Sequence, residues 1–300
     1  MDPVTSALLR SWEWRAEVFI PLLLFGVVYT LGWRTLRAKG SRLANGWRLV
    51  SYWTGIAIIV LALLSPIETL SGQFFFMHMI QHLLLVMLAP PLLLLANPMP
   101  FLVWGLPPTL RRPVAGLLAR LLRRNGPFRG YLRTATNPGI AWMLFVAFLI
   151  GWHDPGAYTA TLRSELVHDL EHLSFFFTAM LYWWHAVGAA PLLHRPLSRP
   201  ARIAYVIAVI PPNMFLGVVL AFAGQVIYTY YETVPRVWGI DPISDQTIGG
   251  IIMWVPGSMM YIIAVLILTA RWLEGEESKP PLPFSKWATD ERMIAPGLEK

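Results

Sequence analysis

Long apolar stretches recur along this chain, and polar segments separate them. A helix needs about 20 residues to cross a bilayer, and most of these stretches approach that length. The fourth stretch is short, so it must either tilt or extend to His153. The pattern predicts an all-α, polytopic transmembrane bundle with seven spans, near residues 18–36, 49–64, 74–96, 138–151, 166–187, 204–223 and 248–270.

The segments outside these spans are short. Residues 1–17 carry Trp12 and Trp14 and are typical of a segment at the membrane interface. They lack the basic start and the cleavage site of a signal peptide. Residues 18–272 form the predicted transmembrane domain, and residues 273–300 are expected to be a mobile cytoplasmic tail.

Composition agrees with a membrane protein, since 56% of the residues are hydrophobic and only 14% are charged. The chain has no cysteine, which excludes disulfides, thiolate metal sites and redox-active thiols. The net charge of +7 lies mostly in the connections between spans. We therefore interpret it as a signal for membrane orientation, and we expect no nucleic acid as a partner.

Basic residues alternate between the connections. The first, third and fifth connections hold fifteen arginines and lysines, whereas the second, fourth and sixth hold only Arg163 and Arg236. Connections rich in Lys and Arg remain in the cytoplasm. This asymmetry predicts that the N-terminus lies outside and the C-terminus inside.

Two further patterns concern local structure. Residues 110–122 have the character of a basic amphipathic helix at the cytoplasmic surface, where anionic lipids of the bilayer attract it. Proline pairs interrupt the third and sixth stretches, and Pro256 interrupts the seventh. Asn213 is placed to provide a hydrogen bond for a carbonyl group that these prolines leave free.

Two pairs of histidines have the spacing that places both rings on one face of a helix. His78 and His82 begin the third stretch, and His168 and His172 begin the fifth. With the predicted orientation, both pairs lie near the outer boundary of the membrane, together with His153. By helix rise, His185 lies about 20 Å deeper than His172, and His194 lies in an inner connection.

Ionisable side chains at membrane depth usually serve a function, and imidazole is the commonest metal ligand in proteins. We therefore predict a metal site formed by His78, His82, His168 and His172, with His153 as a candidate fifth member. Thioethers suit Cu(I), so copper is the expected metal, with Met77 and Met253 as further candidate ligands. The alternative is that these histidines cap helices or bind one another. Carboxylates expected behind the ligands are Asp154, Asp169 and Glu171.

The seventh stretch begins with a second group of polar and small residues. Asp245, Gly249 and Met253 share one helix face, and Gln246 follows Asp245. Asp245 is a candidate helix cap, and Asp245 and Gln246 are candidate supports for the metal site. Gly249 and Gly250 allow another helix to approach closely.

The run from Met77 to Pro91, the pair His168 and His172, and the motif of residues 245–254 together resemble the bacterial CtaG-like family. Members of this family are seven-helix membrane proteins named as cytochrome c oxidase assembly factors and associated with copper supply. The resemblance covers about residues 18–270. It implies a role in maturing a haem–copper oxidase at its copper centre. We therefore expect a non-enzymatic assembly factor in the bacterial inner membrane, with a copper-receiving oxidase subunit and a periplasmic copper donor as partners.

Two other classes of protein remain open on the residues alone. A copper transporter needs ligands across the whole membrane, and no Met or His relay links His185 to the outer histidines. A membrane oxidoreductase with b-haem or two iron ions would use the same histidine pairs. An absorption spectrum separates haem from copper.

Overall fold

The structure is a computed structural model, and it describes residues 10–277. Within these residues all regular structure is helical. The elements are α2 (Ala16–Ala38), α3 (Gly46–Leu64), α4 (Pro66–Ser71), α5 (Phe75–Leu83), the π-helical turn η1 (Leu84–Leu88), α6 (Ala89–Leu95), α7 (Pro98–Gly105), α8 (Pro108–Leu121), α9 (Pro127–Ala135), α10 (Pro138–Trp152), α11 (Pro155–Arg163), α12 (Glu165–Val187), α13 (Arg199–Ile207), α14 (Ile210–Ala221), the 3-10 turn η2 (Thr229–Glu232) and α15 (Pro242–Glu277).

Each predicted apolar stretch lies mostly on helix, and residues 208–209 interrupt the sixth. Five helical segments are long and apolar enough to cross a membrane, namely Ala16–Ala38, Gly46–Leu64, Phe75–Leu95, Arg199–Ala221 and Pro242–Glu277. The pair α9 and α10, bent by 47°, gives a sixth if it counts as one span. Helix α12 has 23 residues, but its first two turns carry histidines and acids that lower its mean hydropathy. The fold is therefore a multi-pass helical bundle, while the number seven remains a prediction.

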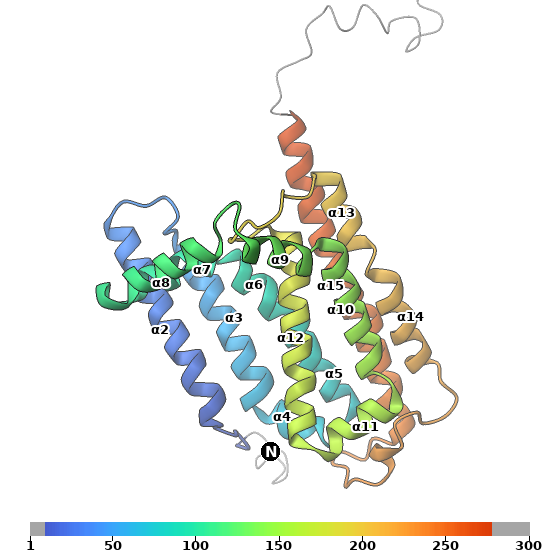
Figure 1. The fold of residues 1–300 in the computed structure, drawn as a ribbon. Helices are drawn as coiled ribbons and strands as arrows, with labels where there is room; N and C mark the ends of the chain where they lie inside the picture. Colours follow the sequence, from blue (N-terminus) through green and yellow to red (C-terminus); the bar gives the residue numbers. More distant parts are fainter. Residues whose placement is uncertain (1–9, 278–300) are drawn as a thin grey trace, which may run out of the picture.

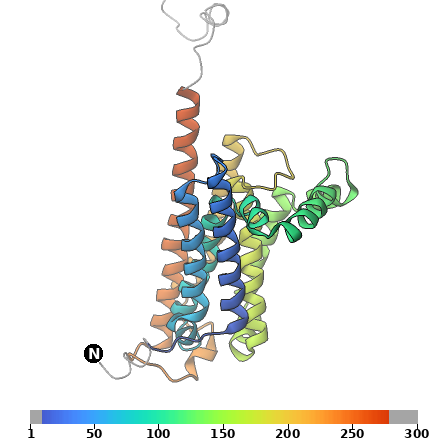
Figure 2. The same cartoon turned by 90° about the vertical axis from the view of Figure 1, so that its left-hand side faces the viewer.

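The bundle has two chemically different ends (Figure 1). Helices α4 and α11 lie at one end, which we call the histidine end. The basic helices α8 and α9 and the connection between α12 and α13 lie at the other, which we call the basic end. Figure 2 shows α8 extending sideways from the bundle at the basic end. The amphipathic helix expected at residues 110–122 is thus confirmed as α8, although its membrane side remains a prediction.

Close helix contacts place α5 against α15 at the histidine end. A Cβ atom on Gly249 would lie 2.3 Å from the ring of Phe75, so only glycine fits there. Further along α15, Asn213 donates a hydrogen bond to the carbonyl of Met253, with a donor–acceptor distance of 3.1 Å. Pro256 removes the helical hydrogen bond to the carbonyl of Ile252, so the bond of Asn213 goes to the carbonyl next to the one that this proline leaves free.

The predicted terminal segments are described only in part. Trp12 and Trp14 are exposed and stack on each other, with ring centroids 5.8 Å apart. Residues 273–277 continue α15. The remainder of the predicted tail, residues 278–300, and residues 1–9 lie outside the described residues.

Candidate metal centre

The two histidine pairs meet at the histidine end of the bundle. His78 and His82 lie on α5, and His168 and His172 lie in the first two turns of α12. The ring centroids of His78 and His168 are 5.1 Å apart, and those of His82 and His172 are 5.6 Å apart. Four imidazoles from two helices thus form one cluster.

Glu171 lies inside this cluster. Its two carboxylate oxygens are 3.3 Å from His78 Nε2 and 3.6 Å from His82 Nε2, and the side chains of His78 and Glu171 are 0% exposed. One ligand atom from each of His78, His82, Glu171 and His172 lies within 4.8 Å of all the others. We call these four residues the inner site.

Hydrogen bonds around His78 determine which ring nitrogen carries the proton. The carbonyl of Ser71 can only accept, so the Tyr231 hydroxyl donates to it. Tyr231 must then accept from the Tyr158 hydroxyl, at 2.9 Å. The Tyr158 oxygen in turn accepts from His78 Nδ1–H, at 2.8 Å. Because neutral imidazole carries one proton, His78 Nε2 presents a lone pair to Glu171.

The inner site leaves several buried atoms without a hydrogen bond inside residues 10–277. They are His78 Nε2, both ring nitrogens of His82, His172 Nε2 and both Glu171 oxygens. A buried carboxylate beside lone pairs is strongly unfavourable unless a cation lies between them. Two ligands about 2.0–2.2 Å from one ion at tetrahedral angles lie about 3.3–3.6 Å apart. The contacts of Glu171 with His78 and His82 match that separation, so the residues fit a metal ion.

A second group of ligand atoms adjoins the inner site. Glu68, His168 and His172 each offer an atom within 4.8 Å of the other two. Glu68 comes from the short helix α4, and its Oε1 lies 3.5 Å from His168 Nδ1. Gln81 donates a hydrogen bond to the other Glu68 oxygen and also binds the carbonyl of Ala62. Burial raises the pKa of Glu68 to about 7, despite that hydrogen bond.

His153 lies beside the cluster and belongs to neither group. It directly follows α10, it is buried, and its Nδ1 donates to the carbonyl of Leu149 at 2.7 Å. Its ring centroid is 6.0 Å from that of His82. His153 and His82 line a small cavity together with Met79, Met87 and Met253. Met77 is half-buried on α5, on a different face from His78.

The other predicted supporting carboxylates have partners of their own. Asp154 caps α11 by accepting from the backbone nitrogens of Gly156 and Ala157. Asp169 forms two hydrogen bonds with the guanidinium of Arg15, at 2.9 and 2.7 Å. Neither carboxylate contacts a histidine ring in these bonds.

Asp245 supports the inner site through the backbone of α5. It is buried and accepts from the nitrogens of Phe75 and Phe76, at 3.0 and 2.9 Å, and from Arg236 at 2.8 Å. These nitrogens begin the helix that carries His78 and His82. Gln246 accepts from the nitrogen of Ile227, at 2.6 Å.

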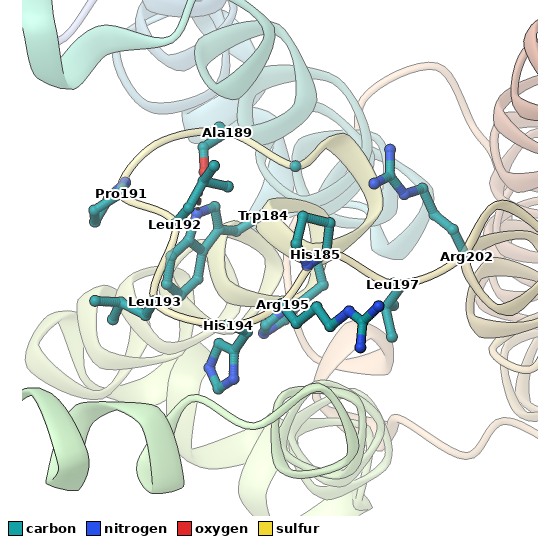
Figure 3. A pocket seen from close by; sticks show the side chains of 12 residues that line it. Trp184, His185, Ala189, Pro191, Leu192, Leu193, His194, Arg195, Leu197 and Arg202 are labelled. Carbon is teal, nitrogen blue, oxygen red and sulfur yellow. Dashed lines mark hydrogen bonds between the residues drawn. The ribbon is translucent and has the colours of Figure 1, made fainter. Parts of the chain in front are cut away.

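His185 and His194 lie at the basic end, away from the cluster. They line a pocket with Arg195 and Arg202 (Figure 3). Both rings also hydrogen-bond to Thr136. Burial and the nearby Arg133 and Arg129 lower the pKa of His194. This position agrees with the separation inferred from helix rise.

Two members of the cluster and one supporting residue were not predicted in these positions. Glu171 was expected behind the ligands, although its spacing from His168 and His172 already placed it on their helix face. Glu68 lies outside the apolar stretches, and the sequence gives no spacing that joins it to His168. Tyr158 lies on α11, and only the tertiary fold places it beside His78.

Three mycobacterial proteins described as uncharacterized are similar to this chain. The chain is 27% identical over 281 residues to an uncharacterized protein of Mycobacterium bovis and to one of Mycobacterium tuberculosis. It is 25% identical over 269 residues to an uncharacterized protein of Mycobacterium leprae. These matches cover 87–90% of this chain but only 39–40% of each relative. No solved structure matches the chain significantly.

A family comparison is more informative, because its match spans most of the chain. The family described as cytochrome c oxidase caa3 assembly factor, Caa3_CtaG, matches residues 27–275. This range includes all the ligand candidates of the cluster and the motif of residues 245–254. The resemblance found in the sequence motifs is thereby confirmed, and this chain belongs to the cytochrome c oxidase caa3 assembly factor family.

Proposed function

We propose that this protein binds copper at the inner site and supplies it to a subunit of a haem–copper cytochrome c oxidase during assembly. The observation that carries the proposal is the buried set of lone pairs and carboxylate oxygens on His78, His82, Glu171 and His172. The family supports the oxidase as the partner. A copper centre is the part of such an oxidase that a metal-binding assembly factor would help to form.

The donor set is consistent with copper but differs from the one predicted. The prediction combined imidazole with thioether, which favours Cu(I). The inner site instead combines three imidazoles with one carboxylate. Imidazole binds copper in both oxidation states, and a carboxylate shifts the preference towards the divalent ion. The thioethers of Met79, Met87 and Met253 line the adjoining cavity.

The proposed location of the inner site follows from the membrane orientation that the basic residues predict. If the basic end faces the cytoplasm, the inner site lies near the outer face of the bacterial inner membrane. There it would receive copper from a periplasmic donor and pass it to the oxidase subunit. The protein would act without catalysing a reaction, which agrees with the description of its family.

Two other functions use the same residues. A b-haem needs its porphyrin plane between two histidine rings, but the rings here contact one another with Glu171 among them. A copper transporter needs ligands along its path, and within residues 10–277 both groups of ligand atoms lie at the histidine end. The assembly role is therefore the better supported function.

Metal analysis of the purified protein tests the proposal. Wild-type protein should bind one copper ion tightly and show no Soret band, and a variant with His78, His82 and His172 replaced by alanine should lose the ion. His185→Ala is the matched control, because its ring lies at the basic end, and it should retain the ion. In cells, the triple variant should leave the oxidase short of copper. A Soret band, or equal copper in the triple variant, would contradict the proposal.

A further inference from the structure

The cluster contains two overlapping groups of ligands that differ in their access to solvent. The inner site is the more buried group, since the side chains of His78 and Glu171 are 0% exposed and that of His82 is 8% exposed. Glu68 and His168 each retain 12% side-chain exposure. The second group therefore lies between the inner site and the surface of the histidine end.

His172 belongs to both groups. The ring centroid of His172 is 4.1 Å from that of His168 and 5.6 Å from that of His82. An ion held by the second group is consequently already bound to one ligand of the inner site. To move to the inner site, the ion exchanges its remaining ligands for those of the inner site. It stays bound to His172 and is not released into the membrane interior.

Glu68 is positioned to take part in this exchange. Gln81 holds one of its oxygens, which leaves Oε1 facing His168. Nothing within residues 10–277 forms a hydrogen bond to His168 Nε2, although that atom is buried. One carboxylate and two imidazoles with solvent nearby suit a divalent ion that retains water as a further ligand.

We propose that Glu68, His168 and His172 form an outer metal position through which a divalent copper ion reaches the inner site. This inference rests on the proposed function, since it concerns loading of the inner site. The bonds to Glu68 and His168 break while bonds to His78, His82 and Glu171 form, and His172 stays bound. No electron is transferred. Because a neutral imidazole has a single lone pair in the ring plane, the shared His172 binds one ion at a time.

Loading kinetics and stoichiometry of the purified protein with CuCl₂ test this inference. Quenching of tryptophan fluorescence gives the loading rate, and copper retained after gel filtration gives the occupancy of the inner site. Glu68→Gln and His168→Gln should each load about tenfold more slowly or worse, yet retain one ion at equilibrium. Glu171→Gln should lose the retained ion. Glu165→Gln, at an exposed acid on the same helix, should behave as wild type.

The outcomes separate this inference from the proposed function. Wild-type protein that retains no copper would refute the proposed function itself. Loading of both outer variants at the wild-type rate would refute only the outer position. So would the loss of the retained ion from both outer variants, because all the ligands would then form a single site. Two retained ions in wild-type protein would refute passage by a shared His172.

Discussion

The two ring nitrogens of His78 face different oxygen atoms, and one nitrogen carries the proton while the other carries a lone pair. The Tyr158 hydroxyl is 2.8 Å from Nδ1, and the Glu171 carboxylate is 3.3 Å from Nε2. The chain of hydroxyl groups from Tyr158 through Tyr231 to the carbonyl of Ser71 fixes the proton on Nδ1. Tyr158 thus acts as a positioning residue, because it keeps Nε2 available as a ligand.

Removing this hydroxyl should weaken metal binding without removing a ligand. Tyr158→Phe leaves His78 Nδ1–H unpaired, so the ring can adopt the other tautomer, and copper affinity should fall about 10–100-fold. A competition titration with a copper chelator measures this change. Tyr228→Phe is the matched control, since it also loses a buried hydroxyl, which donates to the carbonyl of His153. Equal losses in both variants would mean that the effect of Tyr158 is only structural.

The predictability of the site also differs from residue to residue. The spacing of His78 with His82 and of His168 with His172 was sufficient to predict that the pairs share helix faces. Depth in the membrane then predicted that the pairs meet. Glu68 could not be predicted, because its position depends on the short helix α4 folding back beside α5. Sequence spacing carries information only within one helix, and contacts between helices depend on the packing of the whole bundle.

At the scale of elements, the inner site depends on how α5 begins. The first backbone N–H groups of a helix have no hydrogen-bond partner within the helix. Those of α5 lie at the histidine end and are buried. Asp245 of α15 accepts from two of them and is itself held by Arg236. The position of α5 relative to α15 is thus held by one carboxylate and by the close contact at Gly249.

Changing this carboxylate should loosen the site without abolishing it. Asp245→Asn removes the charge that Arg236 and the α5 nitrogens share, and should lower the free energy of unfolding by about 1–3 kcal/mol. Thermal denaturation in detergent measures the loss, and copper retention should fall only in part. Asp241→Asn is the control, because Asp241 caps α15 with an exposed side chain. Complete loss of copper in a folded Asp245→Asn protein would contradict a supporting role.

Helix interruptions show a similar limit on prediction. The prolines at residues 90–91 and 211–212 indicated breaks, and the structure has them near those positions. The π-helical turn Leu84–Leu88 was not predicted, because the side chains of this leucine-rich run are compatible with an ordinary α-helix. The turn begins two residues after His82 and packs against α3 and α12, and the sequence of α5 alone does not contain those contacts.

On the scale of the whole molecule, charge and chemistry separate along the bundle axis. The basic helices α8 and α9 lie at one end, and the histidines and acids of the cluster lie at the other (Figure 1). The alternation of basic connections predicted this separation correctly as a property of the fold. The side of the membrane on which each end lies remains a prediction, since it depends on the bilayer and on the charge difference across it.

Reporter fusions determine this orientation. Alkaline phosphatase, which is active only outside the cytoplasm, should be active when fused after Gly224, in the connection at the histidine end. It should be inactive after Gly126 or Arg195, because Lys and Arg retain those connections in the cytoplasm. A fluorescent protein that folds in the cytoplasm should give the reverse pattern at the same three positions, which controls for expression. Phosphatase activity after Gly126 would reverse the orientation, and the metal centre would then face the cytoplasm and could not receive copper from the periplasm.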